Sequence, residues 1–120
     1  MKRSDQRRAE IAQALLHRPQ VLVFDNPCGA LSVGQRKDLA RNVMGSGLFG
    51  ASAVLWTTRH AQEAALADKV LHLKSGQLWA RGTPRAFLYA AGAGSLEEAI
   101  VWSDGSETPL GKLSELGHHR

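Results

Sequence analysis

The sequence predicts an α/β fold in which parallel strands are flanked by helices, with a β-hairpin towards the C-terminal end. Residues 21–24 and 53–56 are short apolar runs without alternation, which is typical of strands buried on both faces of a parallel sheet. Segments with apolar residues at helical spacing precede, separate and follow these runs. Lys74-Ser75-Gly76 then joins two further apolar runs, as the turn of a hairpin does.

The first helix is predicted to begin at Ser4 or Asp5, because either side chain can accept hydrogen bonds from the free backbone amides of a first helical turn. Pro19 ends this helix, since the residue before a proline avoids the helical region. Its apolar face consists of Ile11, Ala12, Leu15 and Leu16.

The strand at residues 21–24 stops at the turn-forming cluster Asp25-Asn26-Pro27. Ser32 can cap a second helix. The apolar stripe of that helix consists of Leu39, Ala40, Val43 and Met44. Gly45-Ser46-Gly47 ends the helix before the strand at residues 53–56.

An Ala-rich helix is predicted at about residues 61–67, ahead of the hairpin. After the hairpin, Thr83-Pro84 opens another helix, with proline in the first turn, where its missing N–H costs nothing. Ser95 marks one more helix start. From Ser103 onward the sequence is polar and rich in turn residues, which predicts a tail.

Composition excludes several classes of protein. A chain of 120 residues with 43% hydrophobic ones can form a packed core, so wholesale disorder is not expected. The formal charge of +4 suits nucleic acid, but no nucleic-acid-reading motif is present and we expect no such partner. Cys28 is the only cysteine, so an internal disulfide cannot form, and a reducing compartment is expected. No signal peptide and no membrane-spanning run are predicted.

Several segments follow one another in an order and at a spacing that carry a family resemblance. Residues 7–19 (RRAEIAQALLHRP) lead into residues 21–25 (VLVFD), and Gly29-Ala30-Leu31-Ser32 follows. Residues 54–58 (VLWTT) come next, and Ala67-Asp68-Lys69-Val70 precedes the hairpin. Together these segments resemble the C-terminal half of an ATP-binding-cassette (ABC) ATPase domain, from its signature helix through its Walker B strand to its closing hairpin. The match covers about residues 7–88.

The resemblance implies a partial P-loop NTPase-like layered fold at residues 1–102, with residues 103–120 as the polar tail. It implies ATP and Mg²⁺ as cofactors. In the family, an Asp at the end of the Walker B strand holds Mg²⁺ beside the nucleotide phosphates, and Asp25 has that place. Without the resemblance, Asp25 is interpreted as a turn aspartate.

Other functional positions of the family hold different residues here. Asn26 stands at the place of the catalytic Glu, and its amide is not a base near neutral pH, so hydrolysis should be slow. Arg59 stands at the place of the switch histidine, where its permanent charge could still contact phosphate. His60 is one step out of register, about 100° around a helix. Surface residues at a helix start are the alternative interpretation of both.

The D-loop and the signature loop of the family are altered in these 120 residues, and its Walker A loop is missing. Ser32 stands at the place of the D-loop Asp beside the nucleotide, although it also suits a helix cap. The signature loop would fall on Lys2-Arg3-Ser4-Asp5, which lacks its glycines. No Gly-rich Walker A loop followed by Lys is present, so we expect the phosphate cradle to precede this segment in a complete domain.

The resemblance implies an ABC-type ATPase lineage, but the Walker A loop and the catalytic Glu are missing. Three functional hypotheses follow. The chain is a fragment of an ABC transporter ATP-binding protein, a non-catalytic module that docks on a cassette partner or membrane subunit, or an inactive remnant. The first implies two partners, a membrane-spanning transporter subunit and a second ATP-binding subunit, and a cytoplasmic location at the inner face of the membrane. Exposed sheet edges and apolar surface predict self-association.

Overall fold

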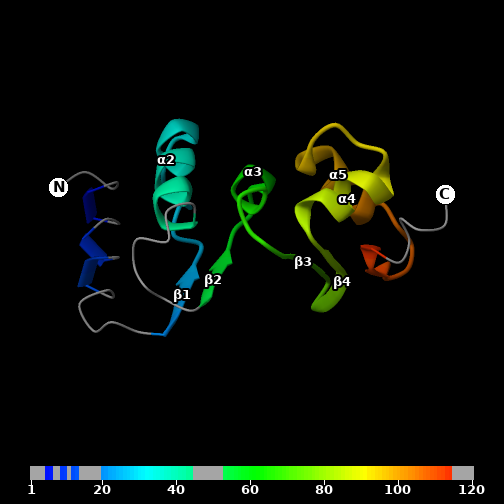
Figure 1. Cartoon of the computed structure of the whole chain (residues 1–120), viewed down its shortest axis with the longest axis horizontal. Coiled ribbons are helices and arrows are strands. Elements are labelled where there is room, and N and C mark those ends of the chain that lie inside the picture. Colours follow the sequence, from blue (N-terminus) through cyan, green and yellow to red (C-terminus); the bar gives the residue numbers. More distant parts are fainter. Residues whose placement is uncertain (1–4, 7–8, 11, 14–19, 45–52, 115–120) are drawn as a thin grey trace. The chain divides into compact units, whose positions relative to one another are not determined.

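The computed structural model describes residues 5–6, 9–10, 12–13, 20–44 and 53–114 (Figure 1). The described residues before residue 20 are helical, as predicted for the first helix. Of the two predicted start residues, Asp5 is itself helical, whereas Ser4 lies outside the described residues, as do the predicted end at Pro19 and Gly45-Ser46-Gly47. The chain divides into two units, Met1–Arg59 and His60–Arg120.

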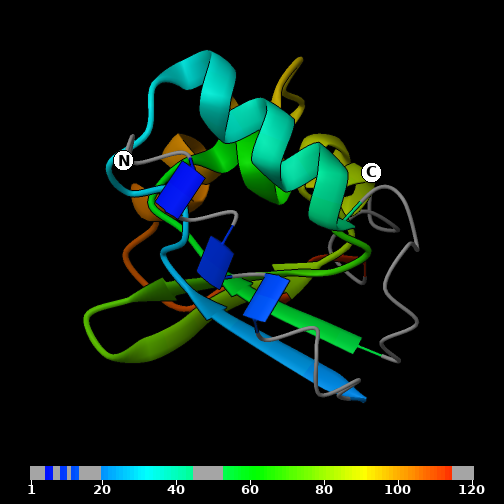
Figure 2. The same cartoon turned by 90° about the vertical axis from the view of Figure 1, so that its left-hand side faces the viewer.

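Unit 1 contains a parallel pair of strands and a helix. β1 (Val21–Asp25) and β2 (Ala53–Thr57) pair so that Asp25 is opposite Thr57, and α2 (Val33–Met44) lies between them in the sequence. Figure 2 shows α2 running across one face of the two strands. The predicted α/β class, with a parallel sheet and helices, is therefore confirmed.

The core of unit 1 forms between α2 and the sheet face below it. Four buried residues make up this cluster: Cys28, Leu31, Leu39 and Val43. Phe24 and Trp56, which are register partners, pack against it with their rings edge to face and their centroids 5.6 Å apart. Three residues of the predicted apolar stripe on α2 are thus buried: Leu39, Ala40 and Val43. The side chain of Met44, the fourth, lies outside the described part of the structure.

The opposite face of the same sheet is exposed, which corrects the prediction of strands buried on both faces. Val21 is 56% exposed, Val23 64% and Leu55 52%, while Leu22 on the other face is 3% exposed. Alternate residues of a strand point to opposite faces, and within the described residues α2 covers only one of them. The apolar run was therefore a correct signal for a strand but not for two-sided burial.

Unit 2 begins with a short helix and the hairpin. α3 (Ala61–Ala64) is shorter than predicted, because the amides of Leu66 and Ala67 donate to carbonyls three residues earlier and tighten the chain into turns. β3 (Val70–Lys74) and β4 (Gln77–Gly82) are antiparallel, which confirms the hairpin. Ser75 and Gly76 both have positive φ, the combination that matches the twist of paired strands.

Two capped helices follow the hairpin. α4 (Pro84–Ala91) begins where the Thr83 hydroxyl accepts a hydrogen bond from the Ala86 amide, and α5 (Leu96–Asp104) begins where the Ser95 hydroxyl accepts one from the Glu98 amide. Both predicted starts are confirmed. The core of unit 2 consists of Val70, Ala80, Phe87, Leu96, Ala99 and Leu113.

The described part of the segment after Ser103 is packed, in contrast to the predicted polar tail. β5 (Gly111–Lys112) pairs in parallel with β4, and Ser103 and Leu113 are both 0% exposed. The Leu110 amide also donates to the Trp79 carbonyl oxygen at 2.7 Å. The polar composition of this segment did not indicate that it packs against the hairpin. Its pairing with β4 and the burial of Leu113 are enough to hold it in place.

Candidate functional site

Asp25 and Thr57 lie together at the carboxyl ends of the two parallel strands. The Thr57 hydroxyl Oγ1 donates a hydrogen bond to Asp25 Oδ1 at 2.8 Å. The backbone N–H of Asn26 donates to the same Thr57 Oγ1 at 2.8 Å and to the Thr57 carbonyl oxygen at 3.1 Å. Asp25 is exposed, so its carboxylate is accessible from solvent at the edge where parallel sheets bind ligands.

Asn26 turns the chain out of the sheet in a left-handed conformation. Its φ is 49°, a region that Asn tolerates better than most residues because its short side chain makes local hydrogen bonds. Gly29 lies under its side chain, and a Cβ added at Gly29 would stand 2.6 Å from Asn26 Nδ2. Asn26 therefore has a structural role in this turn. Its side-chain amide is not basic, so Asn26 provides no general base next to Asp25.

Ser32 acts as the cap of α2. Its hydroxyl accepts a hydrogen bond from the Gln35 amide at 3.3 Å, while Gln35 Oε1 accepts one from the Ser32 amide at 3.1 Å. This reciprocal pair is a capping box, and it satisfies two backbone donors at the start of the helix. The capping alternative for Ser32 is thus present in the structure.

Arg59 and His60 fall at the junction of the two units. Arg59 is exposed and ends unit 1, whereas His60 begins unit 2 as the N-cap residue of α3. The backbone of His60 is extended, with φ −117° and ψ 112°, and its side chain makes no capping hydrogen bond to the helix. Asp25, Asn26, Ser32 and Thr57 all belong to unit 1.

Comparison with known proteins identifies the lineage of the chain. No family model matches it. It is 34% identical to the Fe(3+) ions import ATP-binding protein FbpC of Streptomyces coelicolor, over 91% of this chain and 34% of that protein. It is 39% identical to the aliphatic sulfonates import ATP-binding protein SsuB of Ralstonia nicotianae, over 59% of this chain and 25% of that protein.

A third relative is the spermidine/putrescine import ATP-binding protein PotA of Bacillus anthracis, with 32% identity over 67% of this chain and 25% of that protein. The chain is homologous to the ATP-binding subunits of ABC transporters. It spans between 25% and 34% of the length of these curated relatives. The resemblance to ABC ATP-binding proteins is therefore confirmed as homology.

The Mg²⁺ used by ABC ATP-binding proteins is compatible with Asp25 as one ligand. No group of three His, Cys, Asp or Glu side chains that could hold a metal ion occurs among the described residues. Mg²⁺ does not require such a cage, because it keeps several waters and takes one or two carboxylates together with substrate phosphates. One exposed carboxylate fits that role only when a nucleotide supplies the other oxygens.

Sequence patterns do not indicate Thr57 as a partner of Asp25. They place Thr57 only at the end of a strand, although a polar side chain at the carboxyl end of a strand is a usable signal. The register that places it opposite Asp25 becomes visible only when β1 and β2 are paired. The Oγ1–Oδ1 hydrogen bond spans 32 positions of sequence.

A second polar cluster joins the hairpin of unit 2 to α5. His72 Nδ1 lies 2.8 Å from the hydroxyl oxygen of Ser103, and His72 Nε2 lies 3.7 Å from Asp104 Oδ1. These are the residue types of a hydrolytic triad, but Ser103 is 0% exposed and its hydroxyl cannot meet a substrate. Trp79 Nε1 also donates to the Ser103 carbonyl oxygen at 2.9 Å. The cluster is structural.

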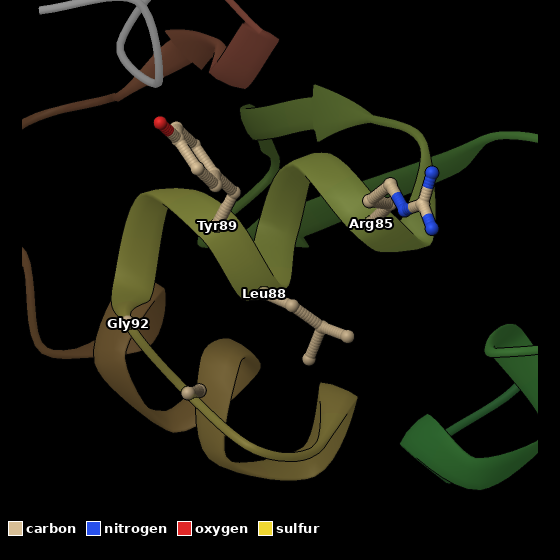
Figure 3. A pocket seen from close by; sticks show the side chains of 5 residues that line it. Arg85, Leu88, Tyr89 and Gly92 are labelled. Atoms are coloured by element: carbon tan, nitrogen blue, oxygen red, sulfur yellow. The ribbon is translucent and has the colours of Figure 1, made fainter. Parts of the chain in front are cut away.

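A shallow depression on α4 does not make a second site. It is lined by Arg85, Leu88, Tyr89, Gly92 and Ala93 (Figure 3). The guanidinium group of Arg85 and the hydroxyl group of Tyr89 point away from each other, so the polar groups of this surface do not converge on one position. No helix among the described residues is long and apolar enough to cross a membrane.

Proposed function

We propose that the chain is part of an ABC transporter ATP-binding protein in which Asp25 takes the metal position beside the nucleotide phosphates. The observation that supports this most is the pairing of Asp25 with Thr57 at the carboxyl ends of two parallel strands, in a chain homologous to ABC ATP-binding subunits. The lineage supports a P-loop NTPase-like layout for residues 1–102. Mg²⁺ and ATP are the cofactors.

The proposed partners are a membrane-spanning transporter subunit and a second ATP-binding subunit, with the chain at the cytoplasmic face of the membrane. The names of the relatives concern import of three chemically unrelated cargoes, a sulfonate, a polyamine and a metal ion. Cargo specificity therefore does not follow from this lineage. Arg59 and His60 are proposed to lie near the γ-phosphate, in place of the switch histidine of the family. Ser32 is proposed to occupy the D-loop position while it also caps α2.

Slow hydrolysis is part of the proposal, because Asn26 supplies no general base. A positioned base typically contributes about 10²–10⁴-fold to a rate. Asn26→Glu should therefore raise ATP turnover of the full chain mixed with an intact ABC ATP-binding protein. At the left-handed φ of 49°, a Glu residue destabilises the fold by about 1–2 kcal/mol relative to a glycine. Folding of the variant must therefore be checked by circular dichroism.

A non-catalytic docking module is the second candidate. The close packing of Asn26 against Gly29 and the capping box at Ser32 favour this candidate, because both residues have structural roles that do not require a nucleotide. Titration of the full chain with Mg·ATP separates the candidates. Micromolar binding that Asp25→Asn weakens supports the nucleotide site. Absence of binding, together with a stable complex with a purified intact ABC ATP-binding protein, supports the module, and absence of both supports the inactive remnant.

A further inference from the structure

We propose that Thr57 is a positioning residue for the Asp25 carboxylate, holding it in one rotamer through the Oγ1–Oδ1 hydrogen bond. The consequence for a cation at Asp25 rests on the proposed function above. The positioning itself depends only on contacts within unit 1. The three groups concerned are the Asn26 amide, the Thr57 hydroxyl and the Asp25 carboxylate.

The direction of the Thr57 hydroxyl is set by its second hydrogen bond. A hydroxyl has one proton to donate and lone pairs to accept with. The Asn26 N–H donates to Thr57 Oγ1 at 2.8 Å, which engages a lone pair on the side of the turn. The hydroxyl proton is then directed to Asp25 Oδ1, also at 2.8 Å. Hydrogen bonds in such a chain polarise and strengthen one another.

The backbone makes this arrangement stiff. Asp25 and Thr57 are register partners at the ends of β1 and β2, so their Cα atoms are held by the strand pairing (Figure 2). Thr is β-branched, and its χ1 is restricted in a strand. Asp25 is exposed and has few neighbours to hold its side chain otherwise. A valine at position 57 would fit the strand equally well but would leave the carboxylate to rotate.

Only one of the two carboxylate oxygens is used by this contact. The hydrogen bond from Thr57 engages Oδ1, and because Asp25 is exposed, Oδ2 can face solvent or a hydrated divalent cation. Fixing Oδ1 removes rotational freedom that binding of a cation would otherwise have to remove. Preorganisation of this kind raises affinity without adding a new contact.

The experiment compares the full chain with Thr57→Val, which removes the hydroxyl at nearly constant shape, and Thr57→Ser, which retains it. Three-bond couplings measured by NMR report the χ1 distribution of Asp25. We expect one dominant rotamer in the original chain and in Thr57→Ser, and averaging over rotamers in Thr57→Val. Equal distributions in the original chain and Thr57→Val would overturn the positioning role, as would averaging in Thr57→Ser.

Titration with Mn²⁺ in the presence of ATP tests the link to the cation, read as paramagnetic broadening of the Asp25 signals. Thr57→Val should need about fivefold more Mn²⁺ than the original chain, the effect of losing about 1 kcal/mol. Thr57→Ser should restore the original midpoint. Equal midpoints for the original chain and Thr57→Val would overturn the link. Absence of broadening in the original chain would overturn the metal role of Asp25 and leave the rotamer result standing.

Discussion

The imidazole of His72 on β3 lies 2.8 Å from the hydroxyl oxygen of Ser103 on α5, and this contact closes the hairpin onto the helix that follows it. Burial lowers the pKa of His72 below its ordinary value of 6.5, an effect that Asp104 opposes and Lys74 reinforces. Lys74 Nζ stands 4.6 Å from the centre of the Trp79 ring and donates to the Asp104 carbonyl oxygen. The neutral imidazole is therefore the form that the folded unit favours.

This pKa shift predicts that the chain loses stability in mild acid. The unfolded state has the higher His72 pKa, so it binds more protons as the pH falls below 6.5. The contribution of His72 is complete above pH 6.5 and declines as the pH falls through the lowered pKa. Urea unfolding at about pH 7.5 and about pH 5.5 should show a smaller free energy of unfolding at the lower pH.

The variant His72→Gln isolates this effect, because glutamine cannot gain a charge but can still bond to Ser103. It should reduce the difference in stability between the two pH values. The same pH dependence in His72→Gln as in the original chain would refute the role of this imidazole.

The capping box at Ser32 predicts a stability effect that the nucleotide-binding interpretation does not. Ser32→Ala should lower the free energy of unfolding by about 1 kcal/mol, because the Gln35 amide loses its acceptor. Ser32→Asp should keep most of the stability, since aspartate is an equally good cap. Urea unfolding and hydrogen exchange at the first turn of α2 measure both. A stable Ser32→Ala variant would show that the cap is dispensable.

The burial of Leu113 predicts that the segment after Ser103 is part of unit 2. Leu113→Ala should lower the free energy of unfolding by about 2–5 kcal/mol, as truncation of a buried leucine does. Leu78→Ala, at a leucine that is 45% exposed, is the control and should have a much smaller effect. If the two variants unfold at the same urea concentration, Leu113 is not a core residue.

The exposed face of the β1–β2 sheet predicts concentration-dependent self-association. Val21, Val23 and Leu55 form an apolar surface on strands without lysine or proline, the residues that usually protect sheet edges. Val23→Lys should shift the chain towards monomer in sedimentation velocity. Val101→Lys, at a valine of similar exposure on α5, should not. A monomer at high concentration in the original chain would contradict the prediction.

Local chemistry was enough to predict most elements of the chain. Ser75-Gly76 predicted the hairpin because the two positive φ angles of such a turn favour glycine and small polar residues. Ser32, Thr83 and Ser95 predicted helix starts because a hydroxyl can bond to amides three residues ahead. The position of Asp25 at the end of a strand followed from an apolar run that meets a turn-forming cluster.

The positions of strands, turns and helix starts, and the lineage that their order indicates, could be predicted from local sequence patterns. The exposure of one sheet face, the burial of Leu113 and the hydrogen bond between Thr57 and Asp25 became visible only in the folded chain. These features depend on groups far apart in the chain, such as Asn26 and Thr57 at a separation of 31 positions. Local patterns describe a residue's conformation, whereas a contact of this kind exists only after the strands have paired.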